Sequence, residues 1–155
     1  MILFFTEEID FQLLRKNSWK NWIKDVCNIH GIKAGELNYI FCNDDYLLKI
    51  NRQYLDHDYF TDIITFPSDI EDGIISGDLF ISIERILDHA ELNNCSFFEE
   101  LKRVMIHGVL HLIGYGDKTE IESEKMRELE KEAMLMFHVE HEKEVYKENV
   151  PRGTK

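Results

Sequence analysis

Hydrophobic and polar positions alternate with two different periods along the chain, which divides it into strand-like and helix-like segments. Short alternating or β-branched runs predict four strands, at 2–5, 36–42, 63–66 and 75–83. Apolar residues three or four positions apart predict three helices, at 11–29, 46–55 and 84–93. Together with two later helices, this order predicts an α+β fold, a mixed sheet of about four strands packed by about five helices.

The two later helices are marked by their first turns. Ser96 followed by Glu99 forms a capping box, and the helix that it opens runs to Gly114. Thr119 followed by Glu122 forms a second capping box and opens an acidic helix. Between positions 104 and 113 only two histidines and a glycine interrupt the apolar residues, which predicts a helix buried all round.

Length and composition indicate one globular domain. The chain has 155 residues, of which 44% are hydrophobic and 31% charged. We expect a single domain over 1–148 and a frayed C-terminal tail over 149–155. No apolar run approaches the roughly 20 residues that span a membrane. Three separated cysteines without a CxxC pair predict reduced core thiols in a cytoplasmic protein: Cys27, Cys42 and Cys95.

The net charge of −12 argues against non-specific binding to duplex DNA. Much of the acidity is local, since ten glutamates and five basic residues lie between Glu120 and Glu148. We interpret this run as the solvated face of one long helix. An enzyme with a small basic patch stays compatible with the charge.

His107 and His111 stand four apart in the apolar helix, so both can direct a nitrogen at one point. A lone histidine in such a helix is more often a core residue with satisfied hydrogen bonds. Two of them need separate partners in an apolar wall, which a shared metal ion supplies. The pair therefore favours a metal site.

A catalytic zinc usually takes three protein ligands, and Asp117 is the candidate for the third. Gly114 can end the helix in a left-handed turn, so that the chain doubles back toward the histidines. The alternative role of Asp117 is to help cap the helix that starts near Thr119. With the histidine pair present, a metal site of three ligands is the preferred interpretation.

The spacing H-x-x-x-H-x-x-G-x-x-D, which runs from His107 to Asp117, resembles that of the metzincin peptidases. Those enzymes carry a glutamate as general base directly after the first histidine. That position is Gly108 here, so a peptidase is disfavoured. A glycine there either leaves room for a phosphate or permits close packing of the helix.

Three motifs resemble the YbeY family of bacterial metal-dependent endoribonucleases, which act in ribosomal RNA maturation. "HGVLHLIGYGD" resembles the H-G-x-L-H-L-x-G-Y signature of the family. "NRQYLDHDYFTDIITFP" and "GDLFIS" resemble two further family motifs, in the family's order. The three span about half of the chain.

The resemblance implies a mixed sheet packed by helices and one zinc ion per chain, held by three side chains. His107 and His111 match the first two ligands, and the family's third histidine falls at Asp117. The arginine that follows the tyrosine in the family's second motif falls at Leu55. Arg52, three residues earlier, is a candidate RNA contact in its place.

Three other positions have weaker candidate roles. His57 stands where the family often has lysine, and it is equally compatible with a solvated loop residue. Asp78 either orients a metal ligand or lies at the edge of the sheet. His138 and His141 lie on a glutamate-rich segment and are expected to face solvent.

The sequence therefore predicts a zinc-dependent endoribonuclease specific for single strands, acting in maturation of small-subunit ribosomal RNA. The expected partners are single-stranded RNA, the rRNA precursor and the ribosome, without DNA or membrane. Two alternatives stay open: a metallohydrolase of another substrate class, such as a peptidase, and a ribosome-assembly factor with a structural zinc. A fourth protein ligand would favour the structural role.

Overall fold

The structure is a computed structural model that describes residues 1–57, 61–68, 71–138 and 144–151. Within these ranges the helices are Lys16–Ile29 (α1), Asp44–Leu55 (α2), Ile83–Leu92 (α3), Phe97–Ile113 (α4) and Glu120–Met134 (α5). The strands are Ile2–Glu7 (β1), Phe11–Leu13 (β2), Lys33–Cys42 (β3), Ile63–Pro67 (β4), Ile74–Ser82 (β5) and Tyr146–Glu148 (β6). No helix of the described residues has both the length and the apolar character needed to cross a bilayer.

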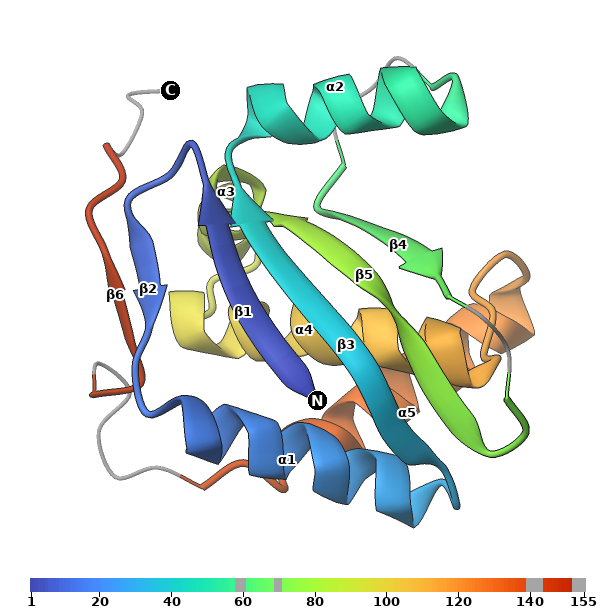
Figure 1. Ribbon diagram of the computed structural model, residues 1–155. Coiled ribbons are helices and arrows are strands. Elements are labelled where there is room, and N and C mark those ends of the chain that lie inside the picture. The colour runs from blue at the N-terminus through green and yellow to red at the C-terminus, as the bar shows by residue number, and fades with distance from the viewer. Residues whose placement is uncertain (58–60, 69–70, 139–143, 152–155) are drawn as a thin grey trace.

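Four strands form the main sheet in the order β1-β3-β5-β4 (Figure 1). The first three are parallel to one another, and β4 runs antiparallel to β5. This mixed sheet with its five helices confirms the predicted α+β class and single domain. The central strands β3 and β5 alternate buried apolar positions with partly exposed ones, as the sequence pattern predicts.

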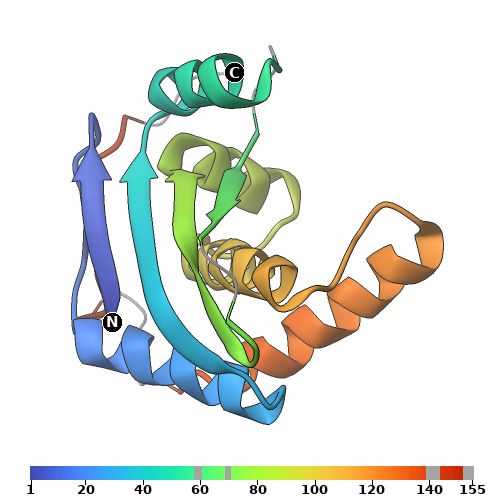
Figure 2. The same ribbon diagram turned by 45° about the vertical axis from the view of Figure 1, so that its right-hand side comes forward.

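The helices divide between the two faces of the sheet. Figure 2 shows α1 and α4 along one face, with α5 on the side of α4 away from the sheet, while α2 lies across the end where the parallel strands finish. Leu47 of α2 packs with Ile64 and Phe80, which point to the face opposite α4. The histidine-bearing helix α4 is therefore enclosed between the sheet and α5.

Gly108 allows α4 to approach the sheet closely. A Cβ atom at this position would lie 2.5 Å from Leu79 Cδ2 and 2.7 Å from Ile63 Cδ1. It would also lie 3.2 Å from Thr65 Cγ2. Of the two explanations for a glycine here, close helix packing is the one that the structure supports, and it leaves no space for a glutamate side chain.

The segment 11–29 was predicted wrongly at its beginning. Phe11–Leu13 forms β2, which pairs antiparallel with β6, and the helix starts only at Lys16. Phe11 and Leu13 are both buried and two positions apart, which is the spacing of one face of a strand, whereas a helix brings positions three or four apart onto one face. Phe11–Leu13 forms a strand because β6, 133 or more positions away along the chain, supplies the partners for its backbone hydrogen bonds.

The first residues of the expected C-terminal tail contact the rest of the domain. The Asn149 N–H donates to the Asp10 carbonyl at 3.0 Å, and the Val150 side chain is 9% exposed within the main core. Residues 152–155, the rest of the expected tail, lie outside the described residues.

Two further expectations need correction. The acidic run is not one long helix, because α5 ends at Met134 and Phe137 then packs against Trp19 and Trp22. Cys27 and Cys42 are buried thiols as predicted, whereas Cys95 is exposed.

Candidate metal centre

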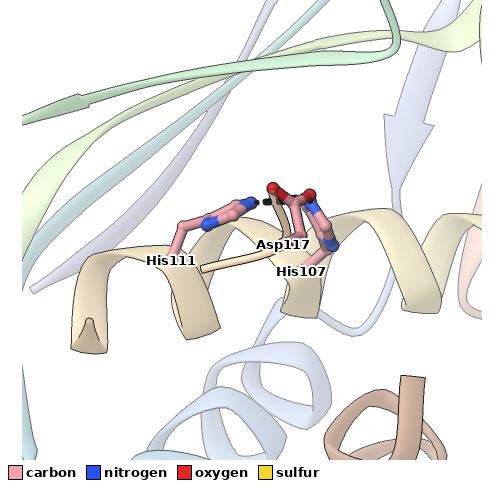
Figure 3. A group of neighbouring side chains, drawn as sticks. All are labelled: His107, His111 and Asp117. Atoms are coloured by element: carbon pink, nitrogen blue, oxygen red, sulfur yellow. Dashed lines mark hydrogen bonds and ion pairs between the residues drawn. The ribbon is translucent and has the colours of Figure 1, made fainter. Parts of the chain in front are cut away.

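Local structure brings two histidines and an aspartate together above α4 (Figure 3). The Ser96 hydroxyl caps the start of this helix by accepting from the Glu99 N–H at 3.1 Å. Gly114 ends it with φ 126°, a conformation that favours glycine, and the chain then reverses. The reversal carries the Asp117 carboxylate back over His107 and His111, as the sequence predicts.

The distances among the three side chains fit a tetrahedral metal site. Asp117 Oδ2 lies 3.4 Å from His107 Nε2 and 3.3 Å from His111 Nε2. Metal–ligand bonds of about 2.0–2.1 Å at the tetrahedral angle place neighbouring donors about 3.3–3.4 Å apart. The two Nε2 atoms are 2.9 Å apart, so they need to separate by about half an ångström around an ion.

Hydrogen bonds on the far side of each ring orient the imidazoles. His107 Nδ1 lies 2.6 Å from Glu130 Oε2, and His111 Nδ1 lies 2.8 Å from the Tyr115 carbonyl oxygen. With each Nδ1 donating to its acceptor, the Nε2 lone pairs of the two rings face each other. Facing lone pairs at this separation repel unless a cation lies between them, so the residues present fit a divalent metal ion.

Glu130 is a site residue that sequence reasoning missed. It was counted within the solvated acidic face, yet its side chain is 5% exposed and it bonds the candidate ligand His107. A signal was present in the spacing, since the buried positions of α5 are Met126, Leu129, Glu130 and Ala133. These positions form one helical face, which places Glu130 on the apolar side of the helix.

A cavity of about 370 Å³ opens in front of the three donors. Its wall is formed by the end of α2 with the following residues, by β4 with the residues before it, and by the three donors: Asn51, Leu55, His57, Thr61, Asp62, Ile63, Ile64, Thr65, His107, His111 and Asp117. Among the described residues, no fourth His, Cys, Asp or Glu joins the donor group. A bound ion would therefore keep a coordination position open to the cavity.

Asp117 does not cap α5, because Thr119 does. Thr119 is the N-cap of α5, with its hydroxyl accepting from the Glu122 N–H at 3.1 Å. The Glu122 carboxylate accepts from the Thr119 N–H in return, which completes the predicted capping box. The Asp117 carboxylate instead faces the two imidazoles.

Asp78 does not reach the candidate metal centre. It accepts a hydrogen bond from Asn38 Nδ2 at 3.0 Å in the middle of the sheet. The next residue, Leu79, faces Gly108 of α4, so alternation along β5 directs Asp78 to the opposite face. Glu130 takes the orienting position that was considered for Asp78.

At the end of α2, Leu55 and the following His57 line the cavity, and Arg52 does not. Leu55 lines the cavity, which is consistent with its match to the family's arginine, and His57 lines it as well. Arg52 is exposed in the last turn of α2 and is absent from the described residues that form the cavity wall. A contact of Arg52 with a ligand would therefore lie outside the cavity. His138 is exposed as expected, and His141 lies outside the described residues.

Substitutions of Asp117 should separate a ligand from a loop residue. Loss of a residue that hydrogen-bonds a metal ligand can weaken metal binding by roughly 100-fold. Asp117→Ala removes a candidate ligand itself, so it is expected to weaken metal binding by at least that factor. Asp117→His should retain the metal, and Asp117→Asn should fall between them, because an amide oxygen is a weaker ligand. Competition titration with a chromogenic chelator measures all three. Wild-type affinity in Asp117→Ala would exclude this carboxylate from the site.

Comparison with known proteins agrees with this geometry. The family model described as "Endoribonuclease YbeY" matches residues 4–138. The chain is 49% identical over 135 residues to the endoribonuclease YbeY of Flavobacterium psychrophilum, covering 87% of this chain and 96% of that protein. It is 48% identical over 126 residues to the endoribonuclease YbeY of Cytophaga hutchinsonii, covering 81% and 88%.

A solved structure extends the likeness to the fold. The solution structure of a Thermotoga maritima protein matches with a TM-score of 0.62 and 26% identity, covering 88% of this chain and 89% of the other. The matched range 4–138 spans the positions of the three candidate donors, of Glu130 and of the cavity wall. The chain belongs to the YbeY endoribonuclease family.

Proposed function

We propose that the chain is a zinc-dependent endoribonuclease that cleaves single-stranded segments of ribosomal RNA precursors in the cytoplasm. The observation that carries this proposal is the donor group of His107, His111 and Asp117 at the wall of an open cavity. Two imidazoles and one carboxylate suit zinc, with one ion per chain. Membership of an endoribonuclease family supports RNA as the substrate.

Each element of the site has a part in this activity. When bound, the metal supplies Lewis acidity that polarises an oxygen of the scissile phosphodiester. His107, His111 and Asp117 hold it at the cavity, while Glu130 and the Tyr115 carbonyl keep the two imidazoles in the required tautomer.

The cavity itself favours an extended substrate. Its volume of about 370 Å³ is at the small end of the roughly 300–1,000 Å³ that is typical of ligand sites. A single strand can present one phosphodiester there with its bases turned away, whereas a duplex holds both backbones in fixed positions. Membership of a family that acts in ribosomal RNA maturation is why we propose ribosomal precursors as the substrate.

No Lys or Arg is among the described residues that form the cavity wall, and this limits how RNA binds. We propose that His57, from the cavity wall, and Arg52, from the neighbouring exposed turn of α2, supply phosphate contacts. Two or three such contacts predict a slope of about −1.4 to −2 in log K against log salt for single-stranded RNA.

Two variants test these contacts. His57→Ala and Arg52→Ala are each expected to weaken RNA binding, and Arg52→Ala, which removes a cation, should also reduce the steepness of the salt dependence by about 0.7. Fluorescence anisotropy with a labelled oligonucleotide at several salt concentrations measures both quantities. Lys24→Ala, a change at an exposed lysine of α1, is the control. A wild-type slope several times steeper would reveal a large basic surface and contradict the proposal of few contacts.

Cleavage assays distinguish this activity from its alternatives. Zinc-loaded protein is incubated with unstructured RNA, with a matched RNA duplex, with single-stranded DNA and with casein, each with and without chelator. The proposal predicts cleavage of the unstructured RNA alone, and loss of this cleavage with chelator. Casein cleavage would favour a peptidase, and zinc binding without cleavage of any substrate would favour a structural zinc in an assembly factor.

A further inference from the structure

A network of charged side chains extends from the rear of His107 to the wall of the cavity. Glu130 accepts from His107 Nδ1 through one carboxylate oxygen, and its other oxygen, Oε1, lies 3.6 Å from Arg103 Nη1. The Glu130 side chain is 5% exposed. A buried carboxylate is costly without a compensating charge, so Arg103 stabilises Glu130 in the position from which it orients His107.

Arg103 is itself held by two more carboxylates. Its Nε donates to Glu100 Oε1 at 3.0 Å and its Nη2 donates to Glu100 Oε2 at 2.5 Å, a bidentate pair. Its Nη2 also lies 3.8 Å from Asp62 Oδ2, and Asp62 is part of the cavity wall. The hydrogen bonds to Glu100 raise the pKa of Arg103 although burial opposes them, so the guanidinium is charged.

The same neighbourhood offers a second group of possible metal donors, formed by Asp62, His89 and Glu100. His89 Nδ1 lies 3.7 Å from Asp62 Oδ2 and 3.9 Å from Glu100 Oε2. These two oxygens are the ones that Arg103 Nη2 already contacts. A metal ion held by them would lie beside the guanidinium, so Arg103 is the cation that this group holds.

We propose that Arg103 is a positioning residue for the metal centre, acting on His107 through Glu130. This inference rests on the metal site of the proposed function. Arg103 does not touch the metal donors, yet it fixes the carboxylate that orients one of them and, through Asp62, ties that carboxylate to the cavity wall. Metal affinity should therefore depend on Arg103 in the way that it depends on Glu130.

A double-mutant cycle on zinc affinity tests this dependence. Arg103→Met and Glu130→Gln are each expected to weaken binding by about 10–100-fold, the usual effect of losing an outer partner. Because Arg103 acts through Glu130, the double variant should bind zinc about as well as Glu130→Gln alone. Losses that multiply in the double variant would overturn the inference, and so would wild-type affinity in Arg103→Met.

Controls separate positioning from general destabilisation. Arg127→Met removes an exposed arginine of α5 whose guanidinium bonds Ser123, and it should leave zinc affinity unchanged. Arg103→Lys keeps the charge but loses the bidentate geometry, so its affinity should lie between wild type and Arg103→Met. If Arg103→Met fails to fold, Arg103→Lys carries the test, and wild-type affinity in it would overturn the inference.

Zinc titration also distinguishes the two levels of the proposal. A wild-type chain that binds no zinc would overturn the metal site and the role of Arg103 together. A wild-type chain that binds zinc, with an affinity that Arg103 does not influence, would overturn only the role of Arg103. A chain that binds zinc with the expected dependence but cleaves no RNA would contradict the proposed activity and leave the positioning role supported.

Discussion

His107→Ala and His111→Ala should each lose the bound metal and the cleavage of RNA. The two Nε2 atoms are the nitrogen donors of the candidate centre, and no other described His, Cys, Asp or Glu side chain joins the group to replace them. The loss should exceed the roughly 100-fold effect of removing an outer partner. Metal content after dialysis and the rate of RNA cleavage are the measurements.

Stability provides a second measurement for the same variants. At a free zinc concentration of about 1,000 times Kd, wild-type protein should gain about 4 kcal/mol of unfolding free energy, and the variants should gain almost none. His138→Ala, which removes an exposed histidine, is the control and should respond as wild type does. Full metal content in both variants would show that the site lies elsewhere.

Gly108→Glu is expected to be strongly destabilising. Even the Cβ atom would lie 2.5 Å from Leu79 Cδ2 and 2.7 Å from Ile63 Cδ1, and the remaining atoms would carry a carboxylate into an apolar contact. Overpacking costs about 1–3 kcal/mol and burial of an unpaired polar group adds a comparable amount, so a loss of about 3 kcal/mol or more is expected.

Gly108→Ala provides the graded comparison. Alanine gains about 1 kcal/mol of helix propensity over glycine, which offsets part of the overpacking, so its net loss should be at most about 2 kcal/mol. Urea unfolding of the metal-free proteins measures both changes without a contribution from the metal. A Gly108→Glu variant as stable as wild type would contradict the close approach of α4 to the sheet.

Local signals in the sequence were sufficient to predict most helices and the turn at Gly114. Ser96 and Thr119 cap the helices that they were predicted to cap, and Gly114 ends α4 in the expected turn. These features depend on a few neighbouring residues, so a single sequence contains the needed information. The position of Asp117 over the histidines follows from the same local geometry.

Features that depend on distant residues could not be predicted in this way. Phe11 and Leu13 form a strand by pairing with β6, which lies 133 or more positions away along the chain. The direction of Asp78 depends on which face of β5 receives α4. Glu130 was recoverable in part, because its helical spacing with buried neighbours places it on the apolar face, but its partner His107 lies 23 residues away.

Anomalous X-ray scattering from crystals of the zinc-loaded protein, recorded above and below the zinc edge, tests the metal centre most directly. The expected result is one peak per chain at about 2.0–2.2 Å from His107 Nε2, His111 Nε2 and an Asp117 oxygen, with a non-protein ligand facing the cavity. A peak among Asp62, His89 and Glu100, or a fourth protein ligand closing the site, would contradict a catalytic metal held by His107, His111 and Asp117.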